Sequence, residues 1–143
     1  MDTTTRTIPA LQRFVEQRTV LLTSFRKDGT PVGTPVNIAV EGDHAFVRSF
    51  DAAWKVKRMH RNPEVEIAPS SFRGQPQGPP IRAWVRELDG AEAEHASDLI
   101  EAKHPILQGI MVPLGHRLKH LRTLHFELRP IAAYAGADPG RWR

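Results

Sequence analysis

The sequence of 143 residues contains no cysteine, so it can form neither a disulfide framework nor a zinc–thiolate site, and it has no thiolate nucleophile. It also lacks any apolar run near the roughly 18 residues that a membrane-spanning helix requires. Its first six residues, MDTTTR, do not resemble the apolar stretch of a secretory signal. These absences predict a cytoplasmic protein that does not associate with membranes.

Three motifs of common enzyme classes are also missing. The sequence has no GxSxG, no GxxxxGK[ST] and no GxGxxG, which disfavours serine hydrolases of that type, P-loop proteins and classical dinucleotide-binding proteins. Aromatic residues make up only 7%, and no predicted strand carries alternating aromatics on which bases could stack. The low aromatic content therefore disfavours a protein that binds single-stranded nucleic acid, which is kept as an alternative function.

What the sequence does have is an excess of arginine. Lys and Arg total 20 against 16 Asp and Glu, and 15 of the 20 are arginine, which gives a net charge of +4 and a pI near 10. The planar guanidinium binds phosphate and carboxylate groups through two parallel hydrogen bonds. The arginine content indicates an anionic partner, although a codon bias would give the same composition.

The chain order predicts one mainly β (α+β) domain over residues 1–143. Asp28 and Gly29 mark a hairpin, and Pro31 and Pro35 predict that the following strand is interrupted or at an edge near them. Thr7 is the expected cap of the first helix. The expected elements are a helix at about 8–18, strands at 19–26, 31–40 and 44–50, a helix at 52–61, strands at 64–69 and 81–88, a helix at 90–103, a possible short helix at 115–122 and a strand at 123–134.

Hairpins between neighbouring strands argue against a parallel nucleotide-binding sheet, which needs crossover connections. Six antiparallel strands with few helices instead predict a small closed β-barrel, which removes its own edges. The barrel would span residues 19–134, with a short tail at 135–143.

The densest chemical feature is the segment WKVKRMHR at residues 54–61, which holds four permanent cations at the start of a predicted helix. A helix start offers free N–H groups for an anion, but its dipole disfavours cations, so a bound phosphate would relieve the conflict. The alternative is a solvated basic face with Arg61 paired to Glu64. Asp51 is the expected helix cap, and it is compatible with a phosphate site only if it points away from it.

Three further groups of residues have two interpretations each. His116 and His120 share the spacing of metal ligands, but no further ligand motif accompanies them, so no metal site is predicted. Glu64 and Glu66 could imitate the carboxylate pair of a glycosidase, but an exposed strand face is the preferred interpretation. The indoles of Trp54 and Trp84 could stack on a ring, although core packing is the commoner use.

Three segments carry a resemblance to a known family: DGTPVGTPVNIAV at 28–40, FVRSF at 46–50 and KVKRMHRNPEVEIAPSSFRGQPQG at 55–78. In their order and spacing the chain resembles, from about residue 15 to 131, the flavin and deazaflavin split-barrel proteins of the pyridoxamine 5'-phosphate oxidase class. More narrowly, it is similar to the B-type branch that depends on coenzyme F420. The resemblance implies a homodimer of six-stranded split barrels with two cofactors in grooves between the subunits.

The resemblance also implies a set of cofactor-binding residues. The phosphate would be held by the basic helix and flanked by the end of the third strand, the ring would lie along the second strand, and the loop after the fourth strand would reach the cofactor or its tail. In this chain these positions are Lys55, Lys57 and Arg58 (helix), Arg48 and Ser49 (third strand), Thr34, Pro35 and Val36 (second strand), and Ser70 and Arg73 (loop).

The expected activity follows from the cofactor, which carries the difficult chemistry. An F420-dependent oxidoreductase would transfer a hydride between reduced F420 and a small, unsaturated organic substrate, and it needs few acid–base residues, so no catalytic residue is assigned. An arginine-rich surface suits the polyglutamate tail of F420 better than the single phosphate of FMN. The alternatives are an FMN-binding protein of the oxidase type, a cofactor carrier without turnover, and the nucleic-acid-binding barrel.

Overall fold

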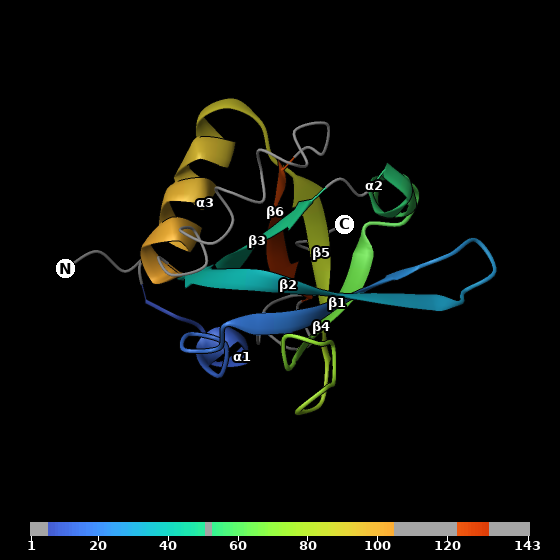
Figure 1. Cartoon of the computed structure of the whole chain (residues 1–143), viewed down its shortest axis with the longest axis horizontal. Helices are drawn as coiled ribbons and strands as arrows, with labels where there is room; N and C mark the ends of the chain where they lie inside the picture. Colours follow the sequence, from blue (N-terminus) through green and yellow to red (C-terminus); the bar gives the residue numbers. More distant parts are fainter. Residues whose placement is uncertain (1–5, 51–52, 105–122, 132–143) are drawn as a thin grey trace.

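A computed structural model describes residues 6–50, 53–104 and 123–131, with backbone only at 50 and 53–55 (Figure 1). The elements follow the predicted order. They are α1 (Pro9–Gln12), β1 (Thr19–Phe25), β2 (Pro31–Glu41), β3 (His44–Phe50), α2 (Ala53–Arg61), β4 (Glu64–Pro69), β5 (Ile81–Glu87), α3 (Gly90–Lys103) and β6 (Thr123–Pro130).

The six strands form a closed antiparallel barrel in the order β1-β2-β3-β6-β5-β4, which confirms the predicted fold class. The last strand, β6, lies between β3 and β5, and the barrel closes where β1 pairs with β4. Closure gives every strand two neighbours over part of its length, so the sheet has no continuous free edge.

Alternation along the strands separates an inner from an outer face. The inner face forms the barrel core, to which β3 contributes Ala45 and Val47. The side chain between them, Phe46, belongs to a second cluster on the outer face, together with Ala96 and Ile100 of α3. Helix α3 therefore packs on the outside of the wall, over β2, β3 and β6 (Figure 1).

Strand β2 contains both prolines without interruption. Pro31 and Pro35 pair with Phe25 and Leu21 of β1, whereas pairing of β2 with β3 begins only at Asn37. The amide of Ile38 donates to the carbonyl of Arg18, so by alternation the nitrogen of Pro35 points away from β1. Near its prolines β2 is a local edge, which is one of the two alternatives that the prolines predicted, and the strand itself is not interrupted.

The first helix is much shorter than the predicted 8–18. It ends at Gln12, and residues 13–17 continue as turns in which Phe14 and Gln17 donate to the carbonyls of Leu11 and Phe14. Thr7 does not cap it, since the cap residue is Ile8 and no side chain makes a capping hydrogen bond. The tighter turns place Leu11 and Phe14 together in the core.

The remaining predicted elements differ little from the observed ones or lie outside the described residues. Strand β6 ends at Pro130, before the predicted end at 134. The predicted helix at 115–122 with His116 and His120, the cap Asp51, residues 132–134 and the tail lie outside the described residues. Within the ranges that are described, no helix is both long and apolar enough to cross a bilayer.

Candidate functional site

Helix α2 covers one end of the barrel and fixes the basic cluster there. Met59 is buried in the core and Val56 packs against it, which directs the neighbouring Arg58 toward β1. Arg58 Nε donates a hydrogen bond of 3.0 Å to Ser24 Oγ. Ser24 is buried, so the guanidinium of Arg58 is anchored at the mouth of the barrel rather than solvated.

The observed bounds of α2 change the electrostatic argument for this cluster. Arg58 and Arg61 lie in the last turn, where the helix dipole favours cations, and only Lys55 lies in the first turn. Glu64 pairs with Arg82 at 2.9 Å, so the expected partner of Arg61 is engaged elsewhere. Lys57 is exposed. Lys55 is therefore the cation that the helix dipole disfavours, and a bound anion would offset this repulsion.

Hydroxyl groups line the inner face at the same end of the barrel. Ser49 follows Val47 on β3 and is buried, and Thr34 and Val36 alternate inward on β2. Thr34 pairs with Leu22, one step from Ser24 along β1. Thr34 and Ser49 therefore face the barrel interior from β2 and β3, and Arg58 reaches Ser24 on β1.

The loop after β4 folds over the outer face beside Pro35. A Cβ placed on Gly74 would lie 3.7 Å from Pro35 Cδ and 3.8 Å from Leu21 Cδ1, so the loop backbone is in van der Waals range of both. Gly74 has a φ of +89°, a conformation that favours glycine. Arg73 is exposed, and its Cζ lies 5.5 Å from the centre of the Phe72 ring. The predicted ring position and Arg73 are therefore neighbours.

Sequence reasoning missed Phe72, which is 75% exposed. The signal was a lone aromatic residue inside a polar, glycine- and proline-rich loop. Ser70, by contrast, is buried and occupied: its Oγ donates to the carbonyl of Ser71 at 2.7 Å, and its own carbonyl accepts from Gln17 Nε2 at 3.1 Å. Ser70 holds the loop in place, whereas Phe72 and Arg73 present its outer surface.

Arg48 lies apart from the other predicted residues. It shares the outer face with Phe46, whereas its neighbour Ser49 faces inward, so the two side chains point to opposite sides of β3. Arg48 is 8% exposed, and burial lowers its pKa while the nearby Glu101 raises it. Burial, and then the charge of Arg48, lowers the pKa of His125.

The remaining candidates have structural surroundings. Glu64 and Glu66 face outward and lie 2.9 and 4.0 Å from Arg82, as an exposed strand face predicts. Trp84 is half-buried on the outer face of β5 and belongs to neither core cluster. The side chains of Trp54 and Lys55 are outside the described part of the chain.

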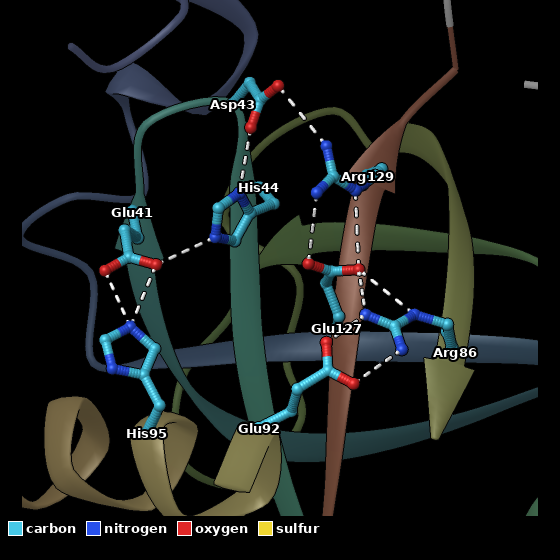
Figure 2. Close-up of polar contacts among 8 residues, drawn as sticks. All are labelled: Glu41, Asp43, His44, Arg86, Glu92, His95, Glu127 and Arg129. Carbon is cyan, nitrogen blue, oxygen red and sulfur yellow. Dashed lines mark hydrogen bonds and ion pairs between the residues drawn. The ribbon is translucent and has the colours of Figure 1, made fainter. Parts of the chain in front are cut away.

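A dense network of ion pairs joins the β2–β3 hairpin, β5, β6 and α3 (Figure 2). At its centre Glu127 accepts from Arg86 Nη2 at 3.0 Å and from Arg129 Nη2 at 3.3 Å. Its members are Glu41, Asp43, His44, Arg86, Glu92, His95, Glu127 and Arg129. Each carboxylate here has an arginine or histidine partner, and across the described ranges no three acidic or histidine side chains are arranged to hold a metal ion.

Lys103 gives the fold a predicted pH dependence. Its Nζ donates to the carbonyls of Phe14 at 3.2 Å and Gln17 at 2.6 Å, and burial lowers its pKa from 10.5 to about 8. Between these values the unfolded chain binds a proton that the folded chain does not, so the free energy of unfolding should rise with pH. Urea titrations from pH 8 to 10.5 should show this rise in the wild type and less of it in Lys103→Met. A Lys27→Met control, at an exposed site, should keep the rise, and an equal rise in both variants would contradict the assignment.

Comparison with known proteins gives the fold. No family model matches the sequence, and no curated protein matches it. Solved structures do match over most of the chain at low identity. A pyridoxamine 5'-phosphate oxidase homologue from Listeria innocua is 15% identical over 85% of this chain and 87% of its own, with a TM-score of 0.54. This chain has the split-barrel fold.

Two other solved structures are slightly more similar to this chain. HutZ, a heme storage protein from Vibrio cholerae, is 17% identical, and a FAD-binding protein from Mesorhizobium loti is 19% identical. Each match covers 87% of this chain and 90% of the other, with a TM-score of 0.58. At these identities the comparison establishes the split-barrel fold and does not identify a ligand. The ligand has to be inferred from the chemistry of the site.

Proposed function

We propose that this split barrel binds coenzyme F420 at the end covered by α2 and transfers a hydride between the reduced cofactor and a small unsaturated substrate. The observation that carries the proposal is Arg58, whose Nε donates to the buried hydroxyl of Ser24 and is thereby fixed at the mouth of the barrel. A guanidinium held in one place is a group that binds a phosphate through paired hydrogen bonds. Lys55, in the first turn of α2, would add a second cation.

The groups around Pro35 fit the ring of such a cofactor. Pro35 and Leu21 offer an apolar surface on the outer face, next to the backbone of Gly74. A flavin or deazaflavin has an apolar face and a polar edge, so strand backbone beside a proline suits it. When bound, the cofactor supplies the hydride chemistry, while this chain positions the ring and limits the access of water.

The similar structures support a planar, ring-bearing ligand. One of them is named as FAD-binding and another as storing heme, and both ligands are large planar ring systems. The exposed Arg73 beside Phe72 favours F420, because its glutamate tail extends beyond the phosphate and needs cations there. FMN, whose charge ends at the phosphate, is the alternative.

A second copy of the chain would complete the groove. Phe72 is a large aromatic side chain with 75% of its surface exposed, next to the proposed ring position. An exposed aromatic residue of this kind is typical of interfaces. We therefore propose a homodimer in which the loop at 70–74 contacts the partner.

The cofactor assignment is tested by titrating the purified protein with F420 and with FMN and following fluorescence. Lys55→Ala should weaken F420 binding by about 1–3 kcal/mol, or roughly 5- to 150-fold, because a charge-assisted contact to phosphate is lost. Arg82→Ala, on the outer face of β5 and paired with Glu64, is the control and should leave the affinity unchanged.

Tighter binding of FMN would replace F420 as the cofactor, and binding of neither would refute the proposed function. Turnover is tested separately: oxidation of reduced F420 by planar unsaturated acceptors distinguishes an oxidoreductase from a carrier such as a storage protein. Strong, steeply salt-dependent binding of single-stranded nucleic acid in place of either cofactor would favour the nucleic-acid alternative.

A further inference from the structure

A row of polar side chains crosses the outer face of the barrel, one step away from Pro35. The strand register aligns Thr19 with Asn37, Asn37 with Arg48, and Arg48 with His125, across β1, β2, β3 and β6. Partners on adjacent strands point to the same face. Asn37 is two residues beyond Pro35 on β2, so it shares that face at a distance of about 7 Å.

Arg48, in the middle of this row, is buried without a hydrogen-bonded anion. It is 8% exposed, and within the described part of the chain its Nη2 atom has no hydrogen-bond partner. The acid whose charge acts on it, Glu101, makes no ion pair with it and instead accepts from Ser97 Oγ at 3.3 Å. A buried guanidinium nitrogen left unpaired costs free energy, so this position favours an acceptor.

His125 presents a second unpaired polar atom beside Arg48. Its Nε2 atom is buried and, among the residues that the structure describes, also lacks a partner. The other histidine near Arg48, His104, is engaged, because its Nε2 donates to the carbonyl of Ile38 at 3.0 Å. Burial lowers the pKa of both histidines, which leaves Arg48 as the charged group of the row.

The single positive charge of Arg48 and its Nη2 atom, unpaired among the described residues, suit a carboxylate. A carboxylate carries a single negative charge and accepts two parallel hydrogen bonds from a guanidinium, whereas a phosphate monoester carries nearly two charges and needs more than one cation. Asn37 and His125, on either side of Arg48, can donate to the same oxygens.

We propose that Asn37, Arg48 and His125 form a carboxylate-binding subsite that recognises the acid group of the substrate beside the cofactor ring. The substrate class is then a small, planar, unsaturated carboxylic acid. This inference rests on the proposed function for the position of the ring, and it moves Arg48 from the cofactor phosphate, where the resemblance placed it, to the substrate. The reason is that Arg48 and Ser49 lie on opposite faces of β3.

The test uses cinnamate as the probe, with cinnamamide as its neutral isostere and inorganic phosphate as the competing anion. Binding to the full chain is measured by calorimetry, with and without F420. Cinnamate should bind at least about 10-fold more tightly than cinnamamide, and Arg48→Met should remove about 10- to 100-fold of the cinnamate affinity. F420 affinity should stay within about twofold, since charge-assisted contacts to the phosphate are untouched.

Matched variants keep the result interpretable. Arg48→Lys keeps the charge but loses the paired donors and should lie between the wild type and Arg48→Met, while Arg82→Met is the exposed control. Arg48→Met should also raise the thermal midpoint, because it removes an unpaired buried charge, and cinnamate should no longer stabilise it. This readout verifies that the variant is folded.

Three results would overturn the subsite. They are equal affinity for cinnamate and cinnamamide, competition by phosphate as strong as that by cinnamate, and loss of F420 rather than cinnamate binding in Arg48→Met. The proposed function fails differently: if the wild type binds cinnamate but neither F420 nor FMN, the subsite stands and the cofactor assignment falls.

Discussion

Replacing Phe126 with alanine is expected to lower the free energy of unfolding by about 3–5 kcal/mol. Phe126 is 1% exposed and lies on β6, aligned with Val47 of β3 on one side and Glu87 of β5 on the other. Its ring fills the core where the last strand joins the barrel, and the neighbouring strands are too tightly paired to close the cavity that alanine leaves. Urea denaturation followed by tryptophan fluorescence measures the loss.

Phe72→Ala is the matched control, because the same atoms are removed from a side chain that is 75% exposed. Its effect on unfolding of the single chain should stay within about 0.5 kcal/mol. The two variants separate core packing from surface chemistry, since Phe72→Ala should instead weaken dimer formation. Equal losses of stability in both variants would show that the core lies elsewhere.

The second large effect is expected from Glu127→Ala, at the centre of the ion-pair network (Figure 2). Glu127 is 7% exposed and accepts hydrogen bonds from two arginines, Arg86 and Arg129. Its removal should cost about 1.5–3 kcal/mol, the range for hydrogen bonds to charged groups. The cost is smaller than for a fully buried pair because both guanidiniums reach solvent and can be hydrated.

Glu92→Ala removes a carboxylate that also contacts Arg86, at 2.8 Å, but that is 59% exposed. Exposed ion pairs contribute little, so this variant should cost less than about 1 kcal/mol. A double-mutant cycle between Glu127→Ala and Arg86→Ala measures the coupling directly. A coupling near zero, or a Glu127→Ala cost no larger than that of Glu92→Ala, would contradict the central role of Glu127.

Most of the barrel could be predicted from the sequence because its strands are amphipathic over a period of two. The segment at 64–69 alternates between charged and apolar residues, the segment at 44–50 follows a turn at 41–43, and the predicted bounds of both agree with the observed ones. The hairpin at Asp28 and Gly29 also formed as expected, with Gly29 at a φ of +89°. These features are encoded locally, so a single sequence carries them.

The first helix could not be predicted from local pattern. Leu11, Phe14 and Val15 have helical spacing, but the structure buries Leu11 and Phe14 through tighter turns and leaves Val15 exposed. Tertiary contacts decide this segment: Gln17 binds the carbonyls of Thr19 and Ser70, which ties the chain to β1 and the loop after β4. The helical spacing of the apolar residues does not reveal either of these hydrogen-bond partners of Gln17.

The sequence suggested which residues could form the candidate site, but not which of them face the same side of the barrel wall. The resemblance supplied Thr34, Ser49 and Arg58, of which the structure places Thr34 and Ser49 on the inner face and Arg58 against Ser24. The separation of Arg48 from Ser49 follows from strand alternation and was available from the sequence. The burial of Arg48 was not, because it depends on how α3 packs over β3, a contact between segments about 50 residues apart.

The position of β6 has a consequence for how the chain assembles. Because β6 inserts between β3 and β5, a nascent chain that lacks residues 123–130 has two unpaired strand borders and an incomplete barrel interior. Val47 and Val85 stay accessible to water until residues 123–130 arrive. We therefore expect the nascent polypeptide to expose this apolar surface until residues 123–130 have emerged, and the barrel to fold in a single step after that rather than piece by piece.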